Sequence, residues 1–326
     1  MEIDLPDDLF TRIRAACAAV AARAVAVRID EARLVRYAAG LPPPSAAPGI
    51  DPDRHRLGRG EETVAFFLTL DAINFGSGWF PHLRKRPGMS GYFTVASSLT
   101  DAYAARGGPV PAAELAAITP RACAEICGQD PDAEPVAELM RLFARALNDL
   151  GRLLLARYDG RFGALVEEAA GSAGRLVELL AEMPFYRDVA RYGDLEVPFY
   201  KRAQLTAADL ALAFDGAGPG RFTDLDRLTI FADNLVPHVL RLDGVLVYDE
   251  GVAARIDAEA LLPAGSPVEV EIRAGAVHAV ELLGAELARG GRPTTSMALD
   301  YLLWTRGQQP EYKRAKPRHR TRTVFY

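Results

Sequence analysis

Lysine is scarce in this chain. Its 326 residues include 38 basic side chains, of which 34 are arginines and only four are lysines, namely Lys85, Lys201, Lys313 and Lys316. Acidic residues number 43, so the formal net charge is −5, which argues against a protein that coats a polyanion such as nucleic acid. A lysine that such an arginine-favouring sequence keeps is a candidate for a specific role.

Cysteines are equally few, and long apolar runs are absent. Cys17, Cys123 and Cys127 form an odd number, which fits a reducing compartment better than a disulfide scaffold. No histidine or second cysteine pair completes a metal site beside Cys123 and Cys127. No apolar run approaches the roughly 18 residues of a membrane helix, and the acidic start MEIDLPDDLF lacks the basic region of a signal peptide. We expect a cytoplasmic protein with no metal and no membrane partner.

Three common catalytic motifs are missing as well. The sequence contains no GxxxxGK[ST], no HExxH and no GxSxG. Phosphoryl transfer by a P-loop, zinc proteolysis and α/β-hydrolase chemistry therefore lose their usual support.

The spacing of apolar residues predicts a mainly α fold. Helical periodicity covers residues 7–24, 61–73 and almost all of 109–193. Apolar and charged residues alternate in SPVEVEIRA at 266–274, which predicts a strand, and the apolar GVLVY at 244–248 predicts another. No βαβ alternation is present, which excludes a Rossmann or barrel fold. We expect a helical bundle-like domain with a small β element.

A proline-rich stretch interrupts the N-terminal part of the chain. LPPPSAAP at 41–48 breaks regular structure, and too little chain precedes it for a separate core, so it is interpreted as a surface connector. We expect a single domain over 1–326. Two lobes, a helical one over 1–195 and a second over 196–326, are the alternative.

Two segments combine aromatic residues with polar or basic ones. In NFGSGWFP at 74–81, glycines between Phe75 and Trp79 predict an irregular segment that presents aromatic faces. In EVPFYKRAQL at 196–205, Lys201 and Arg202 follow two aromatic residues, a combination suited to an anionic ligand such as a phosphate. A surface pair at a helix start, with its stems over the aromatic rings, would give the same pattern.

Carboxylates stand out in two further segments. In LTIFADNLVPHVL at 228–240, Asp233 interrupts an apolar run, either as a helix cap or as a carboxylate whose pKa is tuned by desolvation for base or nucleophile work. His238 in that segment is interpreted as a packed histidine. In TSMALDYLLWTRGQ at 295–308, Asp300 and Trp304 share a helix face and could bind a purine-like ring by its polar edge and its face, although a core helix with a capping aspartate would look the same.

The chain ends in a basic segment, YKRAKPRHRTRTVFY at 312–326. By default such a segment is a solvated tail, but its apolar ending, Val324 to Tyr326, predicts that it docks on the protein.

Several segments, in this order along the chain, together resemble the queuosine salvage protein family, the queuosine 5′-phosphate N-glycosylases. They are NFGSGWF at 74–80, SGYFTVASSLTDAYAARGGPVP at 90–111, FYKRAQLTAADL at 199–210, DLDRLTIFADNLVPHVLRLDGVLVY at 224–248, VEVEIRA at 268–274, ALDYLLW at 298–304 and HRTRTVFY at 319–326. The resemblance implies a mostly helical fold related to the helix-hairpin-helix DNA glycosylases and no metal or other cofactor. It also implies hydrolysis of queuosine 5′-phosphate, which releases the 7-deazaguanine base queuine for salvage in tRNA modification.

We expect Asp233 to be the catalytic carboxylate, because the oxocarbenium-like ribose of such a reaction requires negative charge near C1′ and a water delivered there. Lys201, assisted by Arg202, would hold the 5′-phosphate, and the base would lie against Phe75 or Trp79. The full set of expected substrate-binding residues is Lys201, Arg202, Asn74, Phe75, Trp79, Asn234, His238, Asp300, Tyr301 and Trp304.

Three alternatives stay open from the sequence. A nucleic-acid-binding helical module would use the basic tail and Lys201 as a backbone-contacting surface. A DNA-type glycosylase would use Lys201 as a Schiff-base nucleophile. A noncatalytic binder of modified nucleosides would bind the ligand without releasing base.

Overall fold

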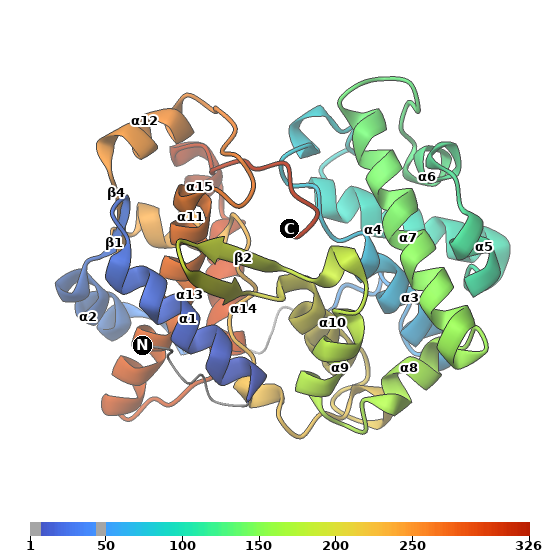
Figure 1. The fold of residues 1–326 in the computed structure, drawn as a ribbon, viewed down its shortest axis with the longest axis horizontal. Helices are drawn as coiled ribbons and strands as arrows, with labels where there is room; N and C mark the ends of the chain where they lie inside the picture. Colours follow the sequence, from blue (N-terminus) through green and yellow to red (C-terminus); the bar gives the residue numbers. More distant parts are fainter. Residues whose placement is uncertain (1–7, 44–49) are drawn as a thin grey trace. The chain divides into compact units, whose positions relative to one another are not determined.

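The computed structural model describes residues 8–43 and 50–326, which divide into two compact units. Within the described residues, unit 1 comprises 8–43, 188–201 and 226–322, and unit 2 comprises 50–187, 202–225 and 323–326. Both units are mainly helical, and the strands form two small two-stranded sheets (Figure 1). The predicted mainly α fold with a small β element is confirmed.

Unit 1 is assembled around one long, buried helix, α13. Its elements are α1 (Leu9–Arg23), β1 (Val27–Ile29), α2 (Glu31–Gly40), β2 (Val189–Tyr192), β3 (Leu195–Pro198), α11 (Val236–Leu242), β4 (Leu246–Tyr248), α12 (Glu250–Asp257), α13 (Pro267–Arg289), α14 (Ser296–Gly307) and α15 (Pro310–Ala315). The antiparallel pairs are β1 with β4 and β2 with β3. Helices α1, α2, α11 and α14 all pack on α13, which places the segments before and after each of them against a common core.

The strand predicted at 266–274 is wrong, because this segment begins α13. Ser266 caps the helix by accepting the backbone amide of Glu269, and Pro267 occupies the first turn, where a proline is tolerated. Charged residues alternate with apolar ones here, as in a half-exposed strand, yet Glu271 and Arg273 are buried with polar partners. Because residues 269–277 are all buried, this half of the helix shows no polar face with a 3.6-residue period, and the alternation of charged and apolar residues was misleading. The other predicted strand, at 244–248, is confirmed as β4.

Unit 2 is a helical body whose longest helix is α7. Its elements are α3 (Glu61–Ala72), η1 (Phe80–His82), α4 (Gly91–Arg106), α5 (Ala112–Ala117), α6 (Pro120–Cys127), α7 (Val136–Tyr158), α8 (Phe162–Glu168), α9 (Ala173–Leu180), η2 (Pro184–Tyr186), η3 (Gly218–Gly220) and α10 (Lys201–Ala213), of which only the first residue belongs to unit 1. Helices α3, α5, α6 and α8 pack against α7 (Figure 1).

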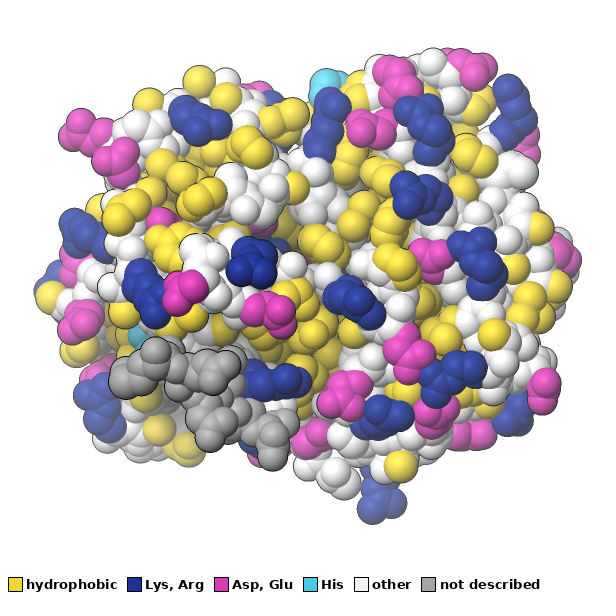
Figure 2. Space-filling model, in the orientation of Figure 1, with side chains coloured by type: hydrophobic (Ala, Val, Ile, Leu, Met, Phe, Trp, Pro, Cys, Tyr) yellow, Lys and Arg dark blue, Asp and Glu magenta, His cyan; other side chains and the backbone are white. Residues whose placement is uncertain are grey.

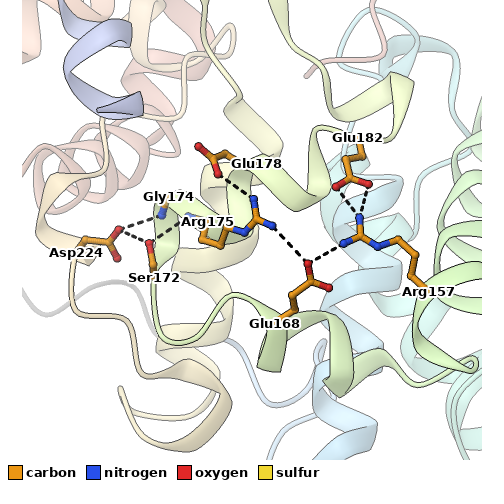
Figure 3. Close-up of polar contacts among 8 residues, drawn as sticks. All are labelled: Arg157, Glu168, Ser172, Gly174, Arg175, Glu178, Glu182 and Asp224. Carbon is orange, nitrogen blue, oxygen red and sulfur yellow. Dashed lines mark hydrogen bonds and ion pairs between the residues drawn. The ribbon is translucent and has the colours of Figure 1, made fainter. Parts of the chain in front are cut away.

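Polar contacts join the C-terminal end of α7 to the two helices that follow it (Figure 3). Arg157 donates to Glu168 on α8 at 2.7 Å and to Glu182, just after α9, at 2.6 Å. The carboxylate of Asp224 accepts the Ser172 hydroxyl at 2.9 Å and the first two backbone amides of α9. The exposed ion pairs of Arg157 contribute little each, whereas Asp224 satisfies two backbone amides at the start of α9.

Most of the predicted helices are found at their predicted positions. The stretch 7–24 contains α1, and 61–73 contains α3. The stretch 109–193 contains helices α5 to α9 but ends in strand β2, which was not predicted. Of the segment 74–81, residues 74–79 are irregular as predicted, and residues 80 and 81 belong to η1. Of the predicted connector at 41–48, residues 41–43 lie outside helices and strands, and residues 44–48 lie outside the described residues. Tyr326 is buried and its backbone oxygen accepts the Gly76 amide at 3.1 Å, so the predicted docking of the chain end is confirmed.

Charged side chains of both signs cover the surface. On the face drawn in Figure 2, basic and acidic side chains are interspersed and do not gather into one basic patch. Cys123 and Cys127 are buried on one face of α6. Over residues 8–43 and 50–326 no cluster of three or more histidine, cysteine or acidic side chains could hold a metal ion. Among the described helices, none combines the length and apolar character that crossing a bilayer requires.

Candidate functional site

Asp233 lies at the start of α11, in the loop that follows the buried segment 228–232. Its Oδ1 atom accepts the backbone amides of Leu235 at 2.7 Å and Val236 at 3.3 Å. The side chain is half-buried, and its Oδ2 atom has no hydrogen-bond partner in the described part of the chain. Oδ1 therefore bonds the backbone amides that lead into α11, and a role of Asp233 as a base or nucleophile stays a prediction.

A second carboxyl group, that of Asp300 on α14, lies close enough to Asp233 to sense its charge. Asp300 is 3% exposed, and its Oδ1 atom accepts the backbone amide of Phe231 at 2.9 Å. Burial raises the pKa of Asp300 well above its ordinary value, and the negative charge of Asp233 raises it further, while the Phe231 amide and Lys201 oppose the shift. The site thus favours the protonated form of Asp300.

Lys201 is the first residue of α10 and is buried, with 6% of its surface exposed. Its backbone amide donates to Oδ2 of Asp188 at 3.1 Å. The preceding residue, Tyr200, has a φ of +47°, in the left-handed region that a tyrosine rarely occupies. The amides of Phe199 and Tyr200 both donate to the backbone oxygen of Asp188, at 2.9 and 3.2 Å. Asp188 therefore fixes the turn that presents Lys201.

A buried ion pair connects this turn to the segment that carries Asp233. Arg273 on α13 contacts Asp188 through both terminal nitrogens, at 2.9 and 2.6 Å, and its side chain is 2% exposed. Its Nε atom donates to the backbone oxygen of Ala232 at 2.9 Å, and its guanidinium group lies 4.0 Å from the ring centroid of Phe199. Sequence reasoning missed Asp188 and Arg273. The charged positions within VEVEIRA were the available signal, but they were assigned to an exposed strand face.

Two histidines are buried in unit 1. The Nε2 atom of His238 lies 3.2 Å from the backbone oxygen of Tyr312, and burial lowers the His238 pKa to about 4, aided by the charges of Arg318 and Arg241. Burial also lowers the pKa of His319 to about 3. The interpretation of His238 as a packed histidine is confirmed.

The remaining expected contacts in unit 1 surround these groups. The Asn234 side-chain amide donates to the backbone oxygen of His319 at 3.2 Å. Asp300 and Trp304 are one turn apart on α14, as predicted, and Trp304 is half-buried. The ring of Tyr301 meets that of Phe231 edge to face, with centroids 6.0 Å apart. The rings of Tyr301 and Trp304 therefore lie on the same helix as the buried carboxyl group of Asp300.

Unit 2 contains the other expected contacts. Asn74 donates from its side-chain amide to Oδ1 of Asp71 at 3.3 Å. Phe75 is buried, and its ring packs edge to face on Phe143, with centroids 5.1 Å apart. Trp79 is buried too, and its indole nitrogen donates to Glu138 at 2.8 Å. Both rings contribute to the core of unit 2, and their stacking on a base stays a prediction.

Arg202 has a structural role within unit 2. The side chain is 1% exposed, and its guanidinium group donates to the backbone oxygens of Asp71 at 2.8 Å, of Ala72 at 2.7 Å and of Phe185. The first two carbonyls end α3, where a cation is favoured by the helix dipole. Assistance by Arg202 in phosphate binding stays a prediction.

Within unit 1 the structure groups Lys201, Asp233 and Asp300, since the charges of the first two act on the third. The arrangement offers a half-buried carboxylate, a buried carboxyl group whose pKa is raised, and a buried lysine. Such a set can stabilise a cationic sugar, donate a hydrogen bond and bind an anion.

Comparisons with known proteins identify sequences similar to this chain. A family model described as queuosine salvage protein matches residues 54–326. A Sphaerobacter thermophilus protein named queuosine 5′-phosphate N-glycosylase/hydrolase is 40% identical over 273 residues, which are 82% of this chain and 83% of that protein. A mouse protein of the same name is 30% identical over 321 residues, which are 92% of this chain and 94% of that protein. A Dictyostelium discoideum protein of that name is 32% identical over 82% of this chain and 79% of its own length.

Proposed function

This chain belongs to the queuosine salvage protein family, and from that premise we propose that it hydrolyses the N-glycosidic bond of queuosine 5′-phosphate and releases queuine. It is an enzyme that hydrolyses an N-glycosidic bond. A fold relationship to the helix-hairpin-helix DNA glycosylases belongs to the same proposal, and the mainly helical architecture supports it. A single functional domain and a cytoplasmic location are proposed with it.

The Asp233 carboxylate is the observation that carries the proposal. Cleavage of the bond generates an oxocarbenium-like ribose, which negative charge near C1′ stabilises. The backbone amides at the start of α11 fix one oxygen of Asp233. The second oxygen, without a hydrogen-bond partner in the described residues, accepts the proton of the attacking water while the charge stabilises the sugar cation.

Asp300 contributes as a neutral group. Its burial and the charge of Asp233 raise its pKa, so that it carries a proton that it can share with the base. A 7-deazaguanine base lacks N7, so it cannot depart by protonation of that nitrogen. A hydrogen bond from Asp300 to another polar atom of the base would offset the charge that develops there. Tyr301 and Trp304, which lie on α14 with Asp300, supply aromatic surface. Asn234 and His238 belong to the same segment as Asp233 and are expected to contact the substrate.

Lys201 binds the 5′-phosphate in this proposal. Its position supports the role, because the side chain is 6% exposed, its charge acts on Asp300, and an ammonium group can bind a phosphate. Binding energy from the phosphate, remote from the scissile bond, then orients the ribose toward Asp233.

The decisive experiment measures release of queuine from queuosine 5′-phosphate by chromatography, with wild-type protein and the Asp233→Asn variant. Turnover is expected to fall by about 10²–10⁴. Asparagine keeps an oxygen that accepts the backbone amides of Leu235 and Val236, but it cannot accept the proton of the attacking water. Asp249→Asn is the matched control. Asp249 also caps a helix of unit 1, α12, by accepting a backbone amide. Turnover of Asp233→Asn within a few-fold of wild type, with the fold intact, would refute the assignment.

A second comparison tests the phosphate contact. Lys201→Ala is expected to lose more kcat/KM with queuosine 5′-phosphate than with the free nucleoside. Equal losses on the two substrates would refute phosphate anchoring by Lys201. Trapping of a covalent adduct by borohydride would instead favour the Schiff-base mechanism of a DNA-type glycosylase. Salt-sensitive binding of nucleic acid without turnover would favour the nucleic-acid-binding alternative.

A further inference from the structure

The ion pair between Asp188 and Arg273 links two parts of the proposed site through direct hydrogen bonds. Asp188 precedes β2, Arg273 lies in α13, and the residues are 85 positions apart in the sequence. The contact is bidentate, with nitrogen–oxygen distances of 2.9 and 2.6 Å, and both side chains are at most 3% exposed. Such a planar, doubly bonded contact has little freedom to change its geometry.

Each partner of the pair also holds a backbone segment. Oδ2 of Asp188 accepts the amide of Lys201 at 3.1 Å, and its backbone oxygen accepts the amide of Tyr200 at 3.2 Å. Nε of Arg273 donates to the backbone oxygen of Ala232, the residue before Asp233, at 2.9 Å. A continuous chain of hydrogen bonds therefore runs from the backbone of Lys201, through Asp188 and Arg273, to the backbone that carries Asp233.

Stability alone does not account for this arrangement. Burying a charged pair costs desolvation energy, and well-packed apolar residues of similar size often replace such pairs without loss of stability. The turn that Asp188 holds is moreover strained, since Tyr200 has a φ of +47°. The strained backbone of Tyr200 and the buried Asp188–Arg273 pair occur at the same turn. We infer that the pair maintains the geometry of this turn more than it adds to stability.

We propose that Asp188 and Arg273 are positioning residues that fix Lys201 relative to Asp233. In queuosine 5′-phosphate, the phosphate and C1′ are joined through one ribose ring and C5′, so their separation varies little. A phosphate-binding lysine held at a set position relative to the catalytic carboxylate converts phosphate binding into correct placement of C1′. The pair thereby determines the preference for the 5′-phosphate over the nucleoside. This inference rests on the proposed function.

Kinetics of Asp188→Asn on queuosine 5′-phosphate and on queuosine test the proposal. Asparagine still accepts the Lys201 amide but loses the charged, bidentate contact with Arg273. We expect kcat/KM to fall about 10- to 100-fold on the phosphate substrate and much less on the nucleoside, because only the former uses Lys201 for placement. Arg273→Lys, which keeps a buried cation but loses the Nε contact with Ala232, is expected to shift the substrate preference in the same direction.

A double-mutant cycle separates positioning from general damage. If Asp188 acts through Lys201, Asp188→Asn adds little to the loss already caused by Lys201→Ala on the phosphate substrate. Glu281→Gln is the matched control, because Glu281 also lies on α13 and pairs with Arg14 at 2.7 Å, and it is expected to leave the substrate preference unchanged.

Three results would overturn the positioning role. They are equal losses on the two substrates, additive losses in the double variant, or full phosphate preference in both Asp188→Asn and Arg273→Lys. If wild-type protein releases base and both variants keep their preference for queuosine 5′-phosphate over queuosine, the positioning role alone is refuted. Wild-type protein that releases no base from either substrate would refute the proposed function, and the positioning role with it.

Discussion

The carboxyl group of Asp300 accepts the backbone amide of Phe231 at 2.9 Å, and Phe231 lies two residues before Asp233 in the sequence. This contact fixes Asp300 beside a second acidic side chain, at a site where 3% of its surface is exposed. Burial, together with the nearby charge of Asp233, raises the pKa of Asp300, so Asp300 retains its proton to higher pH than an exposed aspartate does.

The first prediction concerns the pH dependence of stability caused by Asp300. Its pKa is raised in the folded protein, so the folded state binds more protons than the unfolded state above pH 3.8, and stability falls as pH rises toward the folded pKa. Asp300→Asn keeps an acceptor for the Phe231 amide and removes this loss, which amounts to at most about 1.4 kcal/mol per pH unit. Urea unfolding of wild type and of Asp300→Asn between pH 4 and pH 8 measures this loss of unfolding free energy.

The exposed substitution Asp53→Asn is the control for that series, and it is expected to follow wild type at every pH. Parallel stability curves for wild type and Asp300→Asn across the range would contradict the raised pKa of Asp300.

The second prediction concerns acid sensitivity. Burial lowers the pKa of His238 from 6.5 to about 4, so below pH 6.5 the unfolded state takes up a proton that the folded state excludes. Stability that is complete above pH 6.5 is therefore lost as the pH falls toward 4, by up to about 1.4 kcal/mol per pH unit for this histidine. His238→Gln should flatten the dependence on pH in that window. A dependence unchanged in this variant would show that other groups cause the acid sensitivity.

The sequence was informative where a local pattern carries the structure. Helical periodicity located α1, α3 and α7, and the Asp233 carboxylate, which interrupts an apolar run, indeed accepts backbone amides at the start of a helix. Periodicity failed at α13, because residues 269–277, paired charges included, are all buried and leave no exposed face in the first half of the helix. Asp188 gave no local signal, since its partner Arg273 lies 85 residues away and only the folded chain brings the two together.

Arg202 shows the same limit at a single position. Its place beside Lys201 and two aromatic residues predicts an anion site, which stays a prediction. In the structure its guanidinium group bonds three backbone oxygens of unit 2, contacts that the sequence did not predict. Adjacent cations in a sequence can thus serve different tasks, because successive residues at a helix start face different directions.

The third prediction follows from those contacts. Arg202→Lys keeps the charge, but one ammonium group cannot reach the carbonyls of Asp71, Ala72 and Phe185 together, so buried acceptors are left unsatisfied. The free energy of unfolding is expected to drop by about 2–4 kcal/mol. Arg145→Lys is the control, since Arg145 is exposed and its guanidinium group lies 5.3 Å from the ring centroid of Phe185. Equal melting temperatures for the two variants would argue against the structural role.

The fourth prediction compares two glycines inside long helices. At Gly151 on α7, a Cβ atom would lie 2.3 Å from the backbone nitrogen of Ala116 and 2.5 Å from the backbone oxygen of Ala112, both on α5. Backbone atoms of a packed helix cannot move aside as a flexible side chain can, so α5 and α7 must separate. Gly151→Ala is expected to cost about 3 kcal/mol or more of unfolding free energy.

At Gly284 on α13, the nearest atom to such a Cβ would be 3.9 Å away, an ordinary contact. Gly284→Ala is therefore expected to gain up to about 1 kcal/mol from helix propensity. Denaturant unfolding of both variants checks the difference in sign, and destabilisation of both by similar amounts would show that close helix approach is not what selects glycine at position 151.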